Sequence, residues 1–358
     1  MFDWLFNLVY QCENWIQILL FVVFLVVGLV MLIKGADLFV DSASQIAEKL
    51  KIPSIIIGLT IVALGTSAPE ASVSISSAIM GSNGISIGNI IGSNMFNLFL
   101  ILGLSALFVP VAIKRDIVKR DVLVMVLSSV ILLIFSLFFA VNGSYELLRW
   151  EGVVMLVVFI AYIVYVILDA KKSAKNQSAE NVENTTLSDE KTDTNSAQKE
   201  PEKNSKSKNI WLLIGLLLIG LIAVVAGGEF VTFGAKNIAE QIGVSEALVG
   251  LTIVAVGTSL PELITSVVAL KKKETDIALG NVIGSNIFNT LFILAASSAI
   301  APLVVSLEVL IYTICMTVFF ILFFVYALSH DKISKKAGGV MLLAYAVYFV
   351  LLLLVEFL

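Results

Sequence analysis

The chain has 358 residues, of which 59% are hydrophobic and only 14% are charged, and its formal net charge is -4. Soluble globular domains are about half apolar and about a quarter charged, so this composition excludes a soluble protein. Apolar runs long enough to cross about 30 Å of hydrocarbon recur along the whole length, which excludes a soluble domain with a single anchor. We expect a polytopic membrane protein embedded in a lipid bilayer, with no nucleic-acid partner.

Ten apolar segments of membrane-spanning length predict an all-α polytopic membrane protein. They cover residues 15–33, 52–79, 85–109, 121–140, 150–168, 210–227, 244–270, 277–300, 307–328 and 338–357. Cytoplasmic loops of membrane proteins carry an excess of Lys and Arg. Of the 23 Lys and Arg residues, only Arg149 and Lys236 fall outside one alternating set of loops. This distribution predicts that both termini lie outside, and five segments per half then make two inverted five-helix repeats.

A polar segment separates the two halves. Residues 171–209 are rich in Ser, Asn, Thr, Lys and Glu and lack apolar periodicity. Such a composition buries too little apolar surface to fold, so we expect a disordered cytoplasmic linker that acts as a tether rather than as a calcium-sensing insert. The predicted organisation is an N-terminal membrane half (1–170), this linker, and a C-terminal membrane half (210–358).

The two halves share two motifs at a constant spacing. Residues 58–70 read GLTIVALGTSAPE, and residues 250–262, 192 positions further on, read GLTIVAVGTSLPE. The second motif reads GNIIGSNMFN at 88–97 and GNVIGSNIFN at 280–289. Each half thus contains one repeat, 58–97 or 250–289, and we expect each repeat to supply half of one central site. Inverted repeats with interrupted helices near the bilayer midplane are typical of transporters.

Each repeat places a proline at membrane depth. Pro69 and Pro261 have no amide hydrogen, so the carbonyls of Gly65 and Gly257 lose their helical donors. Open backbone at this depth is tolerated only where protein or a watery cavity satisfies it, so main-chain oxygens become available to a ligand. Hydroxyl groups lie at the same level, on Thr66, Ser67, Thr258 and Ser259.

A glutamate follows each proline. Glu70 and Glu262 lie well inside their segments, with no Lys or Arg nearby in either one. An unpaired charge at that depth costs between about 3 and more than 10 kcal/mol. A bound cation or a proton must therefore compensate it. The alternative is a permanently protonated, hydrogen-bonded Glu, and two symmetric copies beside broken turns argue against it.

The second motif adds a hydroxyl and an amide to each half. Ser93 and Asn97 lie four residues apart on one helical face, as do Ser285 and Asn289. Small and amide residues also serve helix packing in membranes. Because these four lie beside the glutamates, we interpret them as ligands. Two further amides point elsewhere on their helices and are interpreted as interhelical contacts: Asn94 and Asn286.

The combined ligand set is carboxylate, hydroxyl, amide and carbonyl oxygen, without thiolate or imidazole. Such oxygens suit the hard cations Na⁺, Ca²⁺, Mg²⁺ and Mn²⁺. Magnesium demands a near-ideal octahedron and gives up water reluctantly, whereas calcium accepts irregular oxygen cages, so we expect calcium. Two carboxylates balance one divalent ion or two monovalent ions, and a third sodium would make exchange electrogenic.

The sequences GTSAPE at 65–70 and GSNMFN at 92–97, with their second copies, resemble the alpha repeats of the sodium/calcium exchanger family, within the cation/calcium antiporter superfamily. The resemblance covers both repeats and the ten-helix plan. It implies paired inverted repeats around central calcium and sodium sites. It also implies a transporter rather than an enzyme, with Ca²⁺ and Na⁺ as transported ions and no cofactor.

Mapped by motif position, the resemblance implies that Glu70 and Glu262 bridge calcium. The backbone carbonyls of Thr66 and Thr258 would join them. Sodium ligands would come from the hydroxyls of Ser67, Ser93, Ser259 and Ser285 and from the carbonyls of Ala63 and Ala255.

Asn97 and Asn289 would complete the central shell. Potassium-dependent members and some archaeal members carry Asp at the position of Asn289, so the resemblance disfavours potassium coupling. Proton-coupled members lack the Gly-Thr-Ser-x-Pro-Glu form, which disfavours proton coupling. The expected function is alternating-access exchange of Na⁺ for Ca²⁺. Two alternatives stay open, a proton-coupled antiporter for calcium or manganese and a cation channel built on the same oxygens.

Two further acidic residues correspond between the halves. Asp37 and Glu229 precede the repeats at the same spacing and could attract cations toward opposite mouths, although helix capping or an ion pair explains them equally well. We expect a multi-pass protein of a bacterial inner membrane for which a monomer is sufficient.

Overall fold

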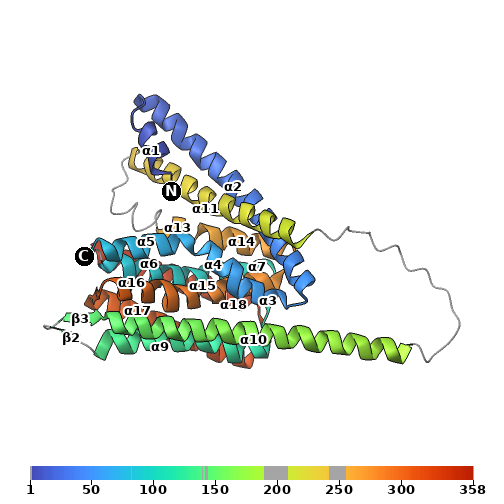
Figure 1. Ribbon diagram of the computed structural model, residues 1–358. Helices are drawn as coiled ribbons and strands as arrows, with labels where there is room; N and C mark the ends of the chain where they lie inside the picture. The colour runs from blue at the N-terminus through green and yellow to red at the C-terminus, as the bar shows by residue number, and fades with distance from the viewer. Residues whose placement is uncertain are drawn as a thin grey trace.

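The computed structural model describes residues 2–81, 83–138, 140–141, 144–188, 209–241 and 255–357. The first half contains α1 (Asp3–Val9), α2 (Asn14–Leu50), α3 (Ser54–Ile57), η1 (Gly58–Val62), α4 (Ala63–Thr66), α5 (Ala68–Ile79), α6 (Asn83–Met95), η2 (Phe96–Ile101), α7 (Leu102–Phe108), β1 (Val111–Ala112), α8 (Arg115–Ile117), η3 (Val118–Val122), α9 (Leu123–Phe138), β2 (Ala140–Val141), β3 (Ser144–Leu147) and α10 (Arg149–Ser188). The second half contains α11 (Ile210–Gln241), α13 (Ala255–Thr258), α14 (Leu260–Lys271), α15 (Thr275–Phe288), η5 (Asn289–Leu294), α16 (Ala295–Ile300), β4 (Leu303–Val305), α17 (Leu307–Ser329), β5 (Lys332–Ile333) and α18 (Lys335–Phe357). The η elements are π-helical turns that continue α-helices (Figure 1).

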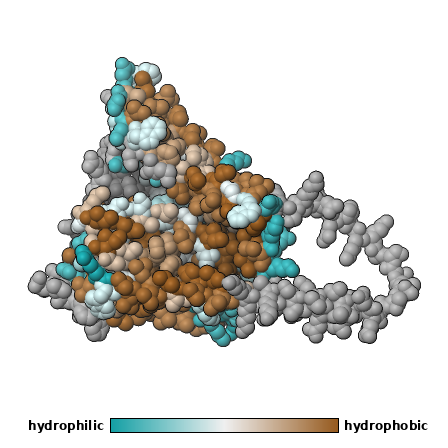
Figure 2. All heavy atoms as spheres, in the orientation of Figure 1, coloured by the Kyte–Doolittle hydropathy of each residue, from teal (hydrophilic) through white to brown (hydrophobic). Residues whose placement is uncertain are grey.

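The helices form a membrane-spanning bundle. Within the described residues, seven helices are long and apolar enough to cross a membrane, and an eighth span is reached if 54–66 and 68–79, which are bent by 49° at their junction, are counted as one. The remaining predicted segments, 244–270 and 338–357, coincide with α13–α14 and with α18, and the residues just before α13 lie outside the described ranges. The helical polytopic fold is confirmed, and the predicted count of ten segments is compatible with it. Figure 2 shows apolar side chains over the middle of the bundle and polar ones toward its two ends.

The first long helix extends well past its predicted end at residue 33. α2 continues because the polar residues of its last third contact the neighbouring loop instead of leaving the helix. Asp41 lies 2.7 Å from Lys272 Nζ, and Ser44 donates to Glu274 at 2.5 Å. The helix ends at Lys51, whose left-handed backbone (φ 54°) stops it.

The linker differs in part from the prediction. α10 continues to Ser188, so residues 171–188 are helical, whereas we expected all of 171–209 to lack structure. Once the apolar part of a helix exists, each further residue adds a hydrogen bond without a new nucleation cost. The Ala, Lys, Gln and Glu residues that follow are good helix formers. The expectation for 189–208 falls on residues outside the described ranges.

α2 and α11 lie side by side as a pair inclined against the rest of the bundle (Figure 1). Glycines recur along their contact, at Gly28, Gly35, Gly220, Gly227 and Gly234. A Cβ added at Gly227 would lie 2.7 Å from the amide nitrogen of Leu32 and 2.8 Å from the carbonyl oxygen of Gly28. The two backbones therefore touch, which small residues permit in membrane helices.

The Lys-rich loops lie together at one end of the bundle. Lys114 Nζ, before α8, lies 2.5 Å from Asp276 at the start of α15. Lys272, after α14, pairs with Asp41 near the end of α2. The C-terminus and α1 lie toward the opposite end, on the left of Figure 1, while α10 ends on the right. The loops that the Lys and Arg distribution places on one side of the membrane thus lie together at one end of the bundle.

Matched helices of the two repeats run in opposite directions. α14 ends in the loop that contacts α2 at the Lys-rich end. The turn from α5 to α6 lies at the other end, where α6 packs against β4 beside the β2–β3 hairpin. This arrangement is what inverted repeats require.

Short strands join the two halves at both ends of the bundle. β1 pairs antiparallel with β5, with Val111 opposite Ile333. At the other end β3 pairs antiparallel with β4, with Tyr145 opposite Val305 and Glu146 opposite Val304. These pairings, which we call the two strand clasps, were not predicted, because runs of two to four residues in loops carry too little periodicity to identify a strand.

Candidate ion-binding site

In each repeat the helix is interrupted at the serine that stands two residues before the proline. Ser67 (φ -82°, ψ 12°) separates α4 from α5, and Ser259 (φ -91°, ψ 6°) separates α13 from α14. A proline is well tolerated in the first turn of the second piece, where its missing amide hydrogen is not needed. The glutamate one residue later then lies in the first turn of α5 or α14, where free amide groups and the helix dipole favour negative charge.

Both glutamates are fully buried, and each accepts from a serine of the opposite repeat. Ser259 donates to Glu70 Oε1 at 2.9 Å, and Ser67 donates to Glu262 Oε1 at 2.8 Å. Ser93 lies 3.4 Å from the same Glu70 oxygen and 3.0 Å from the Ser259 hydroxyl. These crossed contacts bring the two carboxylates into one polar cluster between the repeats.

Several polar atoms of this cluster have no hydrogen-bond partner among the described residues. They are Glu70 Oε2, Glu262 Oε2, Ser285 Oγ, Asn289 Oδ1 and both amide atoms of Asn97. A buried polar atom without a partner costs about 1–3 kcal/mol, and more when it is charged. Since two carboxylates and neutral oxygens converge, and no described Lys or Arg pairs with either carboxylate, the donor set fits a desolvated hard cation.

The helix bearing each glutamate packs against the π-helical turn of the opposite repeat. α5 packs against η5, which begins at Asn289, and α14 packs against η2, which contains Asn97. Both asparagines are fully buried, as is Ser285, while Ser93 is nearly so. All four residues predicted from the second motif therefore lie in the buried interface between the repeats.

The predicted carbonyl ligands are less uniformly placed. The Ala63 carbonyl accepts from the Ser67 amide at 3.1 Å and lies 3.4 Å from the Thr66 hydroxyl. In the second repeat the Ser259 amide bonds to Val256 instead, at 3.2 Å. The backbone of Ala255 begins α13, and nothing is described of its side chain.

Sequence reasoning missed two asparagines that hold the broken helices. Asn89 donates to the Glu70 carbonyl (3.3 Å) and to Ser74 (2.9 Å). Asn281 makes the same two bonds in the second repeat, to the Glu262 carbonyl (3.3 Å) and to Ser266 (3.0 Å). The signal was present, since the asparagines and serines are identical at the repeat spacing.

The same asparagines connect the repeats. Thr66 Oγ1 lies 3.1 Å from Asn281 Oδ1, and Thr258 Oγ1 lies 3.4 Å from Asn89 Oδ1. Each asparagine therefore holds the start of the helix that carries the glutamate of its own repeat and contacts the threonine of the other repeat. The threonine side chains are thereby turned to the partner repeat, which leaves their carbonyls as the atoms to consider as ion ligands.

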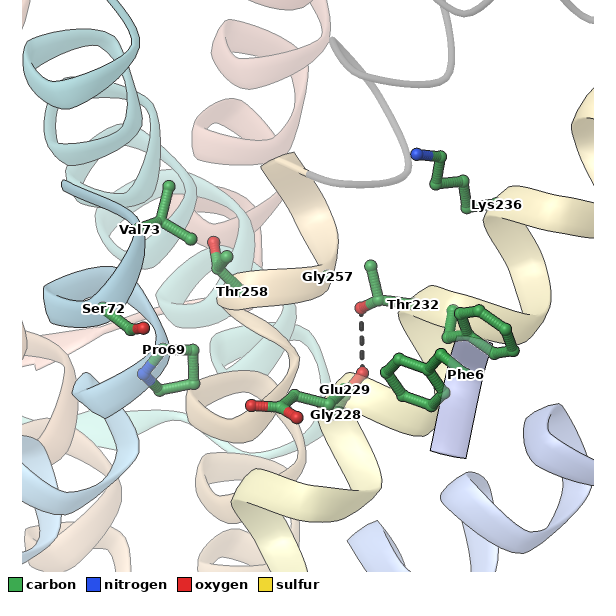
Figure 3. A pocket seen from close by; sticks show the side chains of 11 residues that line it. Phe6, Pro69, Ser72, Val73, Gly228, Glu229, Thr232, Lys236, Gly257 and Thr258 are labelled. Atoms are coloured by element: carbon green, nitrogen blue, oxygen red, sulfur yellow. Dashed lines mark hydrogen bonds between the residues drawn. The ribbon is translucent and has the colours of Figure 1, made fainter. Parts of the chain in front are cut away.

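A cavity of about 350 Å³ leads toward the cluster from the end that carries α1 (Figure 3). Pro69 and Thr258, which adjoin Glu70 and Ser259 in the chain, line its inner side. Phe6 of α1 and Glu229 of α11 line its outer side, and the Glu229 carboxylate points toward Pro69 in Figure 3.

The two extra acidic residues have different surroundings. Glu229 lines this cavity, whereas Asp37 receives Lys272 at the Lys-rich end, where Lys272 Nζ lies 2.9 Å from its carbonyl oxygen and 3.5 Å from its carboxylate. Asp37 therefore has an ion-pair partner in Lys272.

A helical membrane bundle of two inverted repeats, with broken helices and paired buried carboxylates between them, is the architecture of a membrane transporter. The chain matches the family described as sodium/calcium exchanger protein over residues 20–168 and 212–354, and it belongs to that family.

Individual relatives agree with this assignment. The chain is 39% identical to the putative antiporter CaxA of Alkalimonas amylolytica, covering 78% of this chain and 81% of that protein. It is 34% identical to the sodium/calcium exchanger MaX1 of Methanosarcina acetivorans, covering 92% of this chain and 97% of that one. Among solved structures, the sodium-calcium exchanger NCX_Mj soaked with Na⁺ and Sr²⁺ superposes with a TM-score of 0.75 at 32% identity, covering 92% of this chain and 97% of that chain.

Proposed function

We propose that this chain exchanges Na⁺ for Ca²⁺ at the cluster around Glu70 and Glu262. The observation that carries the proposal is the crossed pairing of the carboxylates. Each accepts a hydrogen bond on one oxygen from a serine of the other repeat, and its second, buried oxygen has no partner within the described ranges. Calcium or sodium would supply the missing charge, and relatives that carry the name sodium/calcium exchanger support this choice.

Exchange follows because Na⁺ and Ca²⁺ compete for one set of oxygens. Two carboxylates neutralise one Ca²⁺ or two Na⁺, so the two loads cannot occupy the cluster together without excess positive charge. An empty cluster would hold two uncompensated buried carboxylates, which opposes turnover without a load. Ligands proposed beside the glutamates are the Thr66 and Thr258 carbonyls and the hydroxyls and amides of the second motif. Binding of a third Na⁺ would make exchange electrogenic.

The proposed orientation places the Lys-rich end in the cytoplasm, as the charge rule favours. Both termini and the Glu229 cavity then face outward, and the described ends of the linker face the cytoplasm. The E. coli relative named inner membrane protein YrbG, 32% identical over 78% of this chain, supports a bacterial inner membrane. We further propose that the halves 1–170 and 210–358 are the functional units and that a monomer is sufficient, because both repeats of the cluster come from one chain.

The test is radioactive calcium uptake by purified protein in liposomes loaded with sodium. We expect uptake that requires internal Na⁺ and increases with an inside-positive potential. Glu70→Gln and Glu262→Gln should each abolish uptake, because an amide cannot neutralise the cation. Glu308→Gln is the matched control, since this exposed glutamate lies outside the cluster.

Three outcomes would contradict the proposal. Near-normal uptake by either glutamine variant would remove the carboxylates from the mechanism. Uptake driven by an outward proton gradient alone would indicate a proton-coupled antiporter for calcium or manganese. Calcium current without any counter-ion would indicate a channel.

A further inference from the structure

Three buried side chains form a hydrogen-bonded chain that ends on Asn289. Thr290 Oγ1 lies 3.0 Å from the carbonyl oxygen of Asn286, and Asn94 Nδ2 lies 3.0 Å from Thr290 Oγ1. Asn289 Nδ2 in turn lies 3.1 Å from Asn94 Oδ1. Asn94, Asn289 and Thr290 are all fully buried. The chain of bonds therefore runs from η5 of the second repeat to α6 of the first and back, without access to water.

Proton counting fixes the direction of every bond. A backbone carbonyl can only accept, so Thr290 donates its single proton to the carbonyl of Asn286. The Thr290 oxygen is then an acceptor, which requires the amide nitrogen of Asn94 to face it. The oxygen of Asn94 consequently faces Asn289, whose own nitrogen must turn toward it. An amide that is ambiguous in isolation is oriented here by its neighbours.

The remaining atom of this series is Asn289 Oδ1, which is buried and has no hydrogen-bond partner in the part of the chain that the structure describes. Asn289 begins η5, which packs against α5, the helix that carries Glu70. We propose that Asn94, held by Thr290, is a positioning residue that makes Asn289 present its oxygen rather than its amino group to the transported cation. The inference rests on the proposed function, because it concerns a ligand of that same site.

The corresponding positions of the first repeat do not form the same series of hydrogen bonds. Leu98 stands where the second repeat has Thr290, so no hydroxyl is available to orient Asn286. Asn286 Nδ2 instead contacts Met125 Sδ at 3.5 Å, and its Oδ1 has no described partner. Both amide atoms of Asn97 also lack partners among the described residues. The described contacts therefore orient the central amide of Asn289 but not that of Asn97.

The first experiment is a double-mutant cycle between Asn94→Ala and Asn289→Asp, read by calorimetric titration of Ca²⁺ and of Na⁺ into the purified full chain. In the wild-type background, Asn94→Ala should weaken Ca²⁺ binding by about tenfold to a hundredfold, because Asn289 becomes free to present its amino group. In the Asn289→Asp background the same change should cost less than about threefold, because a carboxylate presents an oxygen whichever way it turns. A purely structural role would give equal losses in both backgrounds.

A second cycle does not involve the ligand residue. Thr290→Val removes the hydroxyl at nearly constant volume and should weaken Ca²⁺ binding by the same factor as Asn94→Ala. The double variant should lose no more than either single one, because both act through one chain of bonds. Asn286→Ala is the matched control. It deletes an equally buried amide outside the chain of bonds and should leave Ca²⁺ affinity within about threefold of wild type.

The outcomes separate this inference from the proposed function. Additive losses in the two cycles, or unchanged Ca²⁺ affinity in Asn94→Ala, would overturn the positioning role while leaving exchange at the glutamates intact. If Asn289→Asp binds no cation, the cycle between Thr290→Val and Asn94→Ala decides whether Asn94 has the positioning role. A wild-type chain that binds neither Ca²⁺ nor Na⁺ would overturn the proposed function and this inference with it.

Discussion

Replacing Gly284 by alanine should weaken ion binding although Gly284 itself is not a proposed ligand. Gly284 lies in α15, where the helix crosses η1 and α4 of the first repeat. A Cβ at this position would lie 2.5 Å from the Leu59 carbonyl oxygen and 2.8 Å from Ala63 Cβ. Carbon and oxygen atoms in contact are ordinarily separated by roughly 3.5 Å, so the two helices would have to move apart by about 1 Å.

That displacement is large compared with the tolerance of a calcium site. Overpacking of this kind costs about 1–3 kcal/mol of folding stability. Calcium–oxygen distances span only about 2.3–2.6 Å, so a shift of about 1 Å would take the proposed carbonyl ligands of Ala63 and Thr66 out of range. A misplacement of about 1 Å commonly costs about 10²-fold in function, and we expect a loss of Ca²⁺ affinity of that order.

Calorimetric Ca²⁺ titration of Gly284→Ala measures the effect, with thermal unfolding in detergent to confirm that the variant is folded. Gly215→Ala on α11 is the control, because no atom of the described residues lies within 4 Å of its added Cβ. A folded Gly284→Ala protein that binds Ca²⁺ with wild-type affinity would refute the reasoning, since the helix crossing would then not set the geometry of the site.

Two further predictions concern the frame around the site. Asp121 is fully buried and bonds both to Arg120, at 2.9 Å, and to Tyr162, at 2.9 Å. Asp121→Asn should lower the free energy of unfolding by about 3 kcal/mol and Tyr162→Phe by about 1.5 kcal/mol in chemical denaturation, and equal effects would contradict the central role of the carboxylate. Cysteines at Glu146 and Val304, which face each other across a strand clasp, should form a disulfide that leaves calcium uptake unchanged, and uptake restored only on reduction would show that this clasp opens during transport.

The sequence predicts which polar residues gather between the repeats, but it does not predict which of them bond to one another. Glu70 and Glu262 stand out because a charge inside an apolar segment is costly and because the surrounding motif occurs twice. Nothing in the sequence indicates that Ser67 bonds to the glutamate of the other repeat rather than to its own. That crossing follows from the three-dimensional interlocking of the inverted repeats.

Two asparagines were missed for the same reason, because the sequence does not show which groups their side chains bond to. Asn89 and Asn281 occupy identical motif positions, yet a Gly-Asn pair near a helix start is also a common turn element. Asn94 was interpreted as an interhelical contact, and it is one, since it bonds to Thr290 and Asn289. Its influence on a ligand became apparent only from the direction of those bonds. Helix ends were missed where polar residues find partners on neighbouring loops, as at the end of α2.

The strand clasps determine where the molecule is stiff. Backbone hydrogen bonds join β1 of the first half to β5 of the second at one end, and β3 of the first half to β4 of the second at the other end. The elements between these two pairings are therefore held at both ends and resist sliding past one another. In the described residues, α2 and α11 contribute no strand to either clasp, and their backbones touch at glycines while aromatic rings such as Phe24 and Phe230 pack across the same contact. Neither clasp therefore holds this pair, and a displacement of α2 together with α11 would leave the backbone hydrogen bonds of both clasps unbroken.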